Sequence, residues 1–437
     1  MADKNTGDSR LESLDQENRR LKRAVEELTI LNDLAREIGA STNSQKIMNT
    51  IIRRALRAVR AEQGVITLVD RKSSTPMRTL VRTMISSADS RPFHLDQSIL
   101  GWMILNKKPL MVNDPPVDDR FRGVRWDESI QTLLAAPLLV KSELIGVLTL
   151  YNKKEEDGGF AEEDQRLLAI IATQSGQVVE NARLYEEEQA LFRMKEELRL
   201  ASGIQHRLLP KTSPQVSGYD IAGVSIPTEA VGGDYFDFML LDGGRLAFCL
   251  GDVSGKGLPA ALLMSNLQAT VRGQAPLAHC PKECIERANR LLFGSTEPDR
   301  FASLFYGILN PHNHDLCYCS AGHEQPFLIR KGAEPSRLEA GGMLLSFLEE
   351  VSYEEACVSL DPGDVLVIYS DGITDALNGL DEAYGEPRLL DLIQNSMEES
   401  AADLMGRIIR EVREHAGDRP QFDDMTLVVI RREVSET

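Results

Sequence analysis

Aspartate residues recur through the C-terminal half of this 437-residue chain, each beside glycine or a second acid. They lie in four short segments: Gly232-Gly233-Asp234, Gly251-Asp252-Val253-Ser254-Gly255-Lys256-Gly257, Ser370-Asp371-Gly372 and Asp423-Asp424-Met425-Thr426. Each segment follows or interrupts an apolar run typical of a strand, so strand ends can bring the carboxylates to one point. Glycine beside a carboxylate lets the backbone approach an ion closely. Carboxylates without nearby His or Cys favour Mg²⁺ or Mn²⁺ over Zn²⁺, so the sequence predicts a metal-dependent enzyme.

The elements that must position these aspartates begin after residue 217. Strands are predicted at 219–227, 235–241, 246–251, 303–309, 316–320, 326–329, 365–369 and 425–430. Helices are predicted at 281–293, 389–397 and 401–415, and a further helix opens at Gly255-Lys256-Gly257 with Pro259 in its first turn. This order predicts an α+β domain over 210–434 in which two β-sheets pack between helices.

The aspartate segments and Ala321-Gly322-His323 follow one another in the order found in PPM-type serine/threonine phosphatases. Residues 195–434, including the entry segment Ile204-Gln205-His206-Arg207-Leu208-Leu209-Pro210, resemble the SpoIIE/RsbU branch of that family. The resemblance implies an α-β-β-α sandwich. It also implies hydrolysis of phosphoserine or phosphothreonine with the help of two Mn²⁺ or Mg²⁺ ions.

The same resemblance implies roles for particular residues. Asp252 would bridge both ions, and Asp252 and Asp371 would act catalytically through a metal-activated water. Between the neighbours Asp423 and Asp424, the sequence does not show which one faces the metal. The implied metal ligands are the side chains of Asp234, Asp252, Asp371, Asp423 and Asp424 and the backbone carbonyl of Val253.

Two nearby residues carry less specific expectations. His323 either touches the metal site or stabilises its loop. Asp237 is interpreted as a turn residue without a role in chemistry.

Three other functions fit these motifs less well. Gly232-Gly233-Asp234-Tyr235-Phe236 is similar to the loop of diguanylate cyclases, but Tyr235 replaces an acid, and the other aspartates would then have no role. A non-catalytic signalling scaffold is the second alternative, which the complete aspartate set disfavours.

A zinc site is a third alternative, on a different set of residues. Its residue types are present, but they fall in a predicted hairpin turn and on one face of a strand, which favours structural roles. Its candidate ligands are His312, His314, Cys317 and Cys319.

The N-terminal part resembles a GAF sensor domain over residues 25–180. Helix, strands, hairpin and helix follow one another there, and Asn152-Lys153 with Phe160 and Asp164 resembles a signature of cyclic-nucleotide GAF domains, with Gln165 in place of its final Glu. We expect these residues to have a structural role, and the sequence does not identify a GAF ligand.

Residues 1–9 are predicted to be disordered. Residues 10–40 are predicted to form a helix with a heptad pattern, whose core positions include Asn18.

A second helical stretch, 175–209, would link the two domains. Leu184 and Leu191 recur with Leu198 every seven residues, and Met194 begins a companion row. The pattern predicts a homodimer formed through helices 11–28 and 184–208.

The composition limits the partners. A formal net charge of -18 argues against nucleic acid or an anionic membrane surface as the main partner. No apolar run reaches the length of a membrane helix, so a cytoplasmic protein with reduced cysteines is expected. The predicted function is a GAF-regulated phosphatase acting on a phosphorylated protein, by resemblance an anti-sigma-factor antagonist.

Overall fold

The computed structural model describes residues 17–18, 43–69, 77–84, 97–154 and 158–434. The chain divides into two compact units between Arg193 and Met194. The segment predicted to be disordered and the heptad helix lie outside the described residues, apart from Glu17 and Asn18, which are helical and exposed. Among helices in the described ranges, none has the length and apolar character needed to cross a bilayer.

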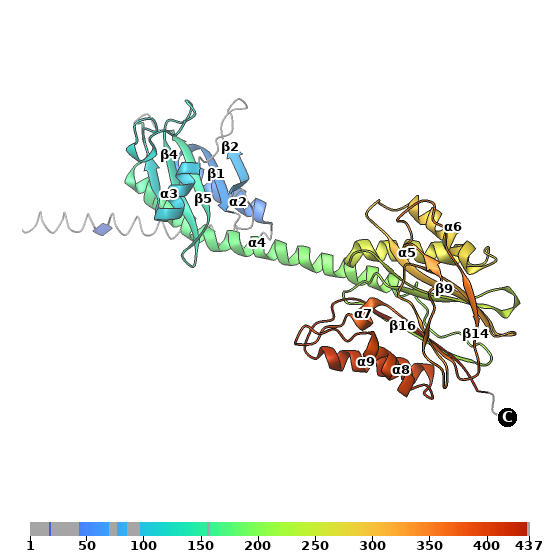
Figure 1. The fold of residues 1–437 in the computed structure, drawn as a ribbon. Helices are drawn as coiled ribbons and strands as arrows, with labels where there is room; N and C mark the ends of the chain where they lie inside the picture. Colours follow the sequence, from blue (N-terminus) through green and yellow to red (C-terminus); the bar gives the residue numbers. More distant parts are fainter. Residues whose placement is uncertain (1–16, 19–42, 70–76, 85–96, 155–157, 435–437) are drawn as a thin grey trace, which may run out of the picture. The chain divides into compact units, whose positions relative to one another are not determined.

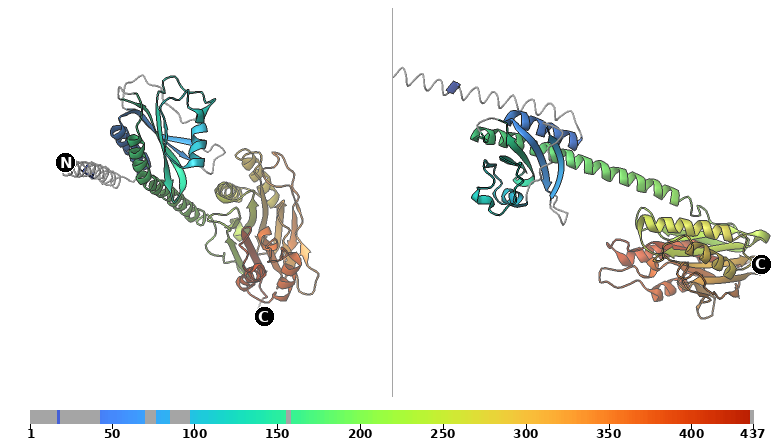
Figure 2. Two further views of the ribbon diagram at one scale, coloured as in Figure 1. Left: turned by 90° about the vertical axis from the view of Figure 1, so that its left-hand side faces the viewer. Right: turned by 90° about the horizontal axis from the view of Figure 1, so that it is seen from above.

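The N-terminal unit is built on one antiparallel sheet with strand order β2-β1-β5-β4-β3. Helices α2 and α4 cover one face and α3 lies against the other (Figures 1 and 2). The elements are α2 (Ser44–Val59), β1 (Ala61–Val69), β2 (Met77–Met84), α3 (Gln97–Asn106), β3 (Leu110–Val112), η1 (Asp119–Phe121), β4 (Leu133–Val140), β5 (Glu143–Lys153) and α4 (Glu162–Gln205).

Helix α2 follows directly from its sequence. Asn43 caps its N-terminus by accepting a hydrogen bond from the Lys46 amide. Ile47, Ile51 and Ile52 recur at helical spacing and are buried against the sheet. Gly64 on β1 allows this close approach, because a Cβ there would lie 2.8 Å from Ile52 Cγ2.

The helices predicted at 161–180 and 175–209 are one continuous helix, α4. No proline lies within it, and its Gly176 packs closely on β4, because a Cβ there would lie 2.7 Å from the Leu139 carbonyl oxygen. The helix ends at Gln205, three residues before the predicted dimer segment 184–208 does. The sensor domain and the linker therefore share one secondary-structure element.

The residues of the GAF-like signature form hydrogen bonds within the N-terminal unit, as expected for a structural role. Lys153 Nζ donates to the Asp164 carboxylate at 2.9 Å and to the Val59 carbonyl at 2.8 Å. Asn152 Nδ2 donates to the Ser129 carbonyl at 2.8 Å. These bonds tie the end of β5 to the end of α2, to α4 and to the loop that precedes β4.

The C-terminal unit confirms the predicted α+β sandwich. One sheet has strand order β13-β10-β9-β8-β7, with β14 also paired to β10, and the other has order β12-β11-β15-β16-β6. The strands are β6 (Tyr219–Ile226), β7 (Tyr235–Leu240), β8 (Leu246–Val253), β9 (Ala302–Asn310), β10 (Asp315–Ala321), β11 (Phe327–Ile329), β12 (Ser336–Arg337), β13 (Gly341–Gly342), β14 (Ala356–Ser359), β15 (Val365–Tyr369) and β16 (Met425–Arg432), with η2 (Asp242–Gly244) between β7 and β8.

Helices cover both outer faces of this sandwich (Figure 1). The first sheet packs against α5 and α6, and the second against α8 and α9. Between the sheets lies a core that includes Phe248, Phe305 and Leu366. The helices are α5 (Gly257–Gln274), α6 (Pro281–Phe293), the short α7 (Asp371–Thr374), α8 (Glu386–Asn395) and α9 (Ala401–Ala416).

Two expectations about this unit are wrong. Cys317 and Cys357, expected to be reduced, form a disulfide because they face each other directly on the antiparallel strands β10 and β14. The same bond takes Cys317 out of the zinc alternative. Asp237, interpreted as a turn residue, is fully buried on β7, and its carboxylate accepts from Arg272 Nη2 at 2.8 Å and from Tyr235 Oη at 2.9 Å. Asp237 therefore joins β7 to the C-terminal turn of α5.

Candidate metal centre

The aspartates predicted from the sequence lie at one end of the sandwich, where strands of both sheets begin or end. Asp234 immediately precedes β7, and Asp252 is the penultimate residue of β8. Asp371 opens α7, two residues after β15 ends. Asp423 and Asp424 immediately precede β16. Four separate chain segments thus deliver carboxylates to a common region.

Asp252 is the central member of this group. Burial raises its pKa to about 7, and the charges of Asp371, Asp423 and Asp424 act in the same direction. Burial also raises the pKa of Asp234, with Asp252 as the next cause, and that of Asp371, with Asp423 as the next cause. Each carboxylate therefore lies within the field of the others, and their mutual repulsion calls for a compensating positive charge.

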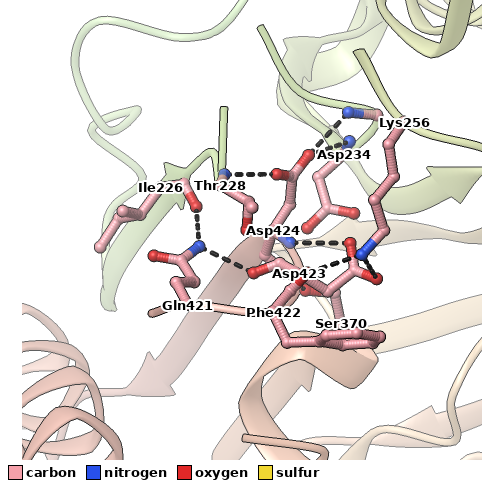
Figure 3. A network of polar contacts seen from close by, with 10 residues as sticks. Ile226, Thr228, Asp234, Lys256, Ser370, Gln421, Phe422, Asp423 and Asp424 are labelled. Atoms are coloured by element: carbon pink, nitrogen blue, oxygen red, sulfur yellow. Dashed lines mark hydrogen bonds and ion pairs between the residues drawn. The ribbon is translucent and has the colours of Figure 1, made fainter. Parts of the chain in front are cut away.

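Asp423 and Asp424 have different surroundings, which the sequence did not reveal (Figure 3). The Asp424 carboxylate is buried and accepts backbone N–H bonds from Thr228 at 2.7 Å, Gly233 at 2.6 Å and Asp234 at 3.3 Å. The partly exposed Asp423 carboxylate instead faces Lys256, with 3.0 Å between Oδ2 and Nζ. Asp424 therefore holds the loop that carries Asp234, and Asp423 is the more exposed carboxylate of the pair.

Two glycines permit this packing. A Cβ on Gly232 would lie 2.4 Å from Asp424 Oδ2, and a Cβ on Gly372 would lie 2.1 Å from the Asp424 carbonyl oxygen. Real Cβ atoms do not approach other atoms so closely. Ser370 completes the contact, because its hydroxyl donates to the same carbonyl at 3.0 Å and accepts from the Thr426 amide at 2.9 Å.

Lys256 is a functional candidate that the sequence analysis left without a role. Its ammonium donates to the Phe422 carbonyl at 2.6 Å, pairs with Asp423, and lies 4.0 Å from the centre of the Phe422 ring. The available signal was its place in the glycine-rich Asp252 loop, four residues after that carboxylate.

His323 is connected to the Asp252 strand through Ser303. The imidazole is buried, which lowers its pKa to about 4, so it is neutral near pH 7. Its Nδ1 lies 2.8 Å from Ser303 Oγ, which accepts from the Asp252 amide at 3.3 Å. His323 thus supports the Asp252 backbone through Ser303, which agrees with a loop-stabilising role.

The donor set fits divalent cations that prefer oxygen. Asp234 Oδ2 is buried without a hydrogen-bond partner, and a Cβ on Gly233 would lie 3.3 Å from both Asp252 Oδ1 and the Val253 carbonyl oxygen. Within the described part of the chain, no three His, Cys, Asp or Glu side chains are grouped tightly enough to form a complete ligand cage. A cation would have to draw these like-charged groups together, because unscreened carboxylates repel one another.

Comparison with known proteins identifies the family. Residues 242–433 match the family model described as stage II sporulation protein E (SpoIIE), and residues 41–180 match the GAF domain model. Phosphoserine phosphatase RsbU of Bacillus subtilis is 32% identical over 257 residues, which cover 57% of this chain and 75% of RsbU. The chain belongs to the SpoIIE/RsbU family of PP2C-type serine phosphatases.

Other relatives agree with this assignment. Protein IcfG of Synechocystis is 28% identical over 263 residues, which cover 54% of this chain and 41% of IcfG. The solved SiaA-PP2C domain of Pseudomonas aeruginosa shares the fold, with a TM-score of 0.50 and 20% identity over 55% of this chain and 98% of that domain. The protein is therefore a GAF-domain phosphoprotein phosphatase of a metal-dependent family, and the scaffold and diguanylate cyclase alternatives are set aside.

Proposed function

We propose that this SpoIIE/RsbU-family phosphatase holds Mn²⁺ or Mg²⁺ with Asp234, Asp252, Asp371, Asp423 and the Val253 carbonyl. The observation that carries the proposal is the position of Asp252 at the end of the sandwich. Burial raises its pKa there, and three other aspartates lie close enough for their charges to raise it further. Asp424, whose carboxylate already accepts three backbone N–H groups, is assigned to positioning the Asp234 loop.

Each group then has a distinct task in phosphate ester hydrolysis. Mn²⁺ or Mg²⁺ held by these aspartates would supply positive charge for the phosphoryl oxygens and would acidify a water molecule. Asp252 and Asp371 would orient that water. His323 and Ser303 keep the Asp252 backbone in place, and Asp424 keeps Asp234 in place. The direct test is phosphate release from phosphoserine proteins with and without Mn²⁺, and a chain inactive on all of them in Mn²⁺ would contradict the assignment.

We infer that the substrate is a small phosphorylated regulator of the anti-sigma-factor antagonist type. The support is family membership. The net charge of -18 gives a phosphoprotein no general attraction to this chain. Recognition must therefore come from local contacts beside the metal centre. Comparison of phosphorylated antagonists with unrelated phosphoserine proteins tests this, and equal kcat/KM for both groups would contradict it.

The GAF domain is proposed to regulate the phosphatase through α4. This helix belongs to the sensor core at Leu168 and Val179 and continues to Gln205, whose side chain bonds both the amide and the carbonyl of Gly232. Gly232 packs on Asp424, so a movement of the helix end would reach the Asp234 loop. Deletion of residues 1–175 is expected to change the Mn²⁺ concentration needed for half-maximal activity severalfold, measured by phosphate release. Superimposable metal titrations would exclude this route.

We also propose that α4 forms a homodimer. Leu191 and Met194 are 60% and 61% exposed on this helix, and Leu184 lies one heptad before Leu191. Leu191→Glu is expected to convert a dimer to a monomer, measured by light scattering during gel filtration. Arg193→Glu changes an exposed residue about 200° around the helix from Leu191 and serves as the matched control. A parent chain that is monomeric at the same concentration would contradict the proposal.

A further inference from the structure

A cavity of about 270 Å³ opens beside the metal centre of the phosphatase unit. It lies between α7, the last turns of α9 and the segment 417–425. Gly372 and Asp423 belong to its lining and to the metal centre alike. Its apolar lining includes Leu377, Val412, Ala416, Pro420, Phe422 and Met425.

Phe422 connects this cavity to the metal centre. Lys256 Nζ lies over its ring at 4.0 Å and also pairs with Asp423, while the Phe422 side chain is largely exposed (Figure 3). The segment is held in place by Gln421, whose Nε2 donates to the Asp423 carbonyl at 2.7 Å and to the Ile226 carbonyl at 2.8 Å. The Phe422 segment would therefore lie between a ligand in the cavity and a phosphoryl group at the aspartates.

The size of the cavity limits what it can hold. Pockets for drug-sized ligands occupy roughly 300–1,000 Å³, so this one suits one or two side chains better than a separate cofactor. Its lining also includes the polar residues Asp375, Arg413 and Arg419. An apolar side chain would be buried against the apolar residues while the peptide backbone that carries it lay near the polar ones.

We propose that this cavity is a specificity pocket for an apolar side chain of the substrate protein, within three residues of its phosphoserine. The proposal rests on the proposed function, since the phosphoserine must lie at the aspartates. An extended peptide advances about 3.3 Å per residue, so a side chain one to three residues away can pass Phe422. Burial of a leucine-sized side chain there would favour the matching substrate by about tenfold or more in kcat/KM.

The test uses the full-length chain in Mn²⁺ and a set of synthetic phosphoserine peptides. Each peptide carries Leu at one position from three residues before to three residues after the phosphoserine, and Ala at the others. One position is expected to raise kcat/KM about tenfold over the all-Ala peptide, mainly through KM. The small ester p-nitrophenyl phosphate reports on the metal centre alone, because it has no side chain that could reach the cavity.

Ala416→Trp fills the cavity from α9 and is expected to abolish the Leu preference while leaving hydrolysis of p-nitrophenyl phosphate within about twofold of the parent. Ala402→Trp, at an exposed position on the first turn of the same helix, is the matched control and should retain the preference. Leu377→Ala is a second variant that enlarges the cavity. It should weaken the preference for Leu and favour Phe at the same peptide position.

Three results would overturn the pocket assignment. They are equal kcat/KM for all peptides, a Leu preference that survives in both Ala416→Trp and Leu377→Ala, and an Ala416→Trp variant that loses the small ester and the peptides in parallel. If the parent hydrolyses neither p-nitrophenyl phosphate nor any peptide in Mn²⁺, the proposed function fails and the pocket assignment fails with it. That outcome is distinguished from the others by the small ester.

Discussion

Replacement of Asp252 by Asn is expected to lower phosphate release in Mn²⁺ by roughly 1,000-fold, about 4 kcal/mol of transition-state stabilisation. The amide keeps the shape of the side chain but removes the charge of the carboxylate that lies among Asp234, Asp371 and Asp423. Cations held by the remaining carboxylates would be bound less tightly and out of position. Initial rates on a phosphoserine protein across a Mn²⁺ titration measure the effect.

The same variant makes a separate prediction for stability. Burial and neighbouring negative charges raise the Asp252 pKa to about 7, so the charged form is disfavoured in the folded protein. The stability that this group contributes is present at low pH and is lost as the pH rises through 7. Asn cannot ionise, so above pH 7 the metal-free variant should have a Tm at least as high as that of the parent.

Mn²⁺ should then distinguish the two proteins. It should raise the Tm of the parent, because a ligand that binds only the folded state stabilises it, and it should raise the Tm of the variant much less. Asp391→Asn, at an exposed position on α8, makes the same chemical change outside the aspartate cluster and should behave like the parent. Parent-like activity of Asp252→Asn would show that the centre is assigned to the wrong residues.

The sequence predicted the parts of this protein that depend on local patterns. Apolar alternation and glycine at turns were enough to predict the two-sheet sandwich. Because the aspartates follow apolar runs, their place at the strand ends, including those of Asp234 and Asp252, was also predicted. Strands β12, β13 and β14 were missed because they contain two to four residues and lack an alternating pattern. Without β14, the direct pairing of Cys317 with Cys357 could not be foreseen.

Properties that depend on contacts distant in sequence could not be predicted. Asp237 resembled a turn residue because its partner, Arg272, lies 35 residues away on α5. The neighbours Asp423 and Asp424 looked equivalent because their difference is set by the loop that ends at Asp234, 190 residues earlier. Lys256 had no predicted role because its partners, Phe422 and Asp423, belong to another segment.

That difference between Asp423 and Asp424 gives a matched pair of substitutions. Asp423→Asn is expected to raise the Mn²⁺ concentration for half-maximal activity at least tenfold, because a charged ligand is lost from the centre. Its effect on the free energy of unfolding should be within about 1 kcal/mol, since the lost pair with Lys256 is partly exposed. Phosphate release and urea unfolding measure the two effects.

Asp424→Asn should show the opposite profile. The new amide group would face backbone donors that the carboxylate now accepts, and buried donors without partners cost about 1–3 kcal/mol each. We expect the free energy of unfolding to fall by about 2–4 kcal/mol on this basis. Activity should fall with the fraction of molecules in which the Asp234 loop is out of place. Gly232→Ala probes the same contact independently, because its Cβ would collide with Asp424 Oδ2. If Asp424→Asn instead left stability intact and raised the Mn²⁺ requirement, Asp424 would be the metal ligand and Asp423 the neighbour that positions it.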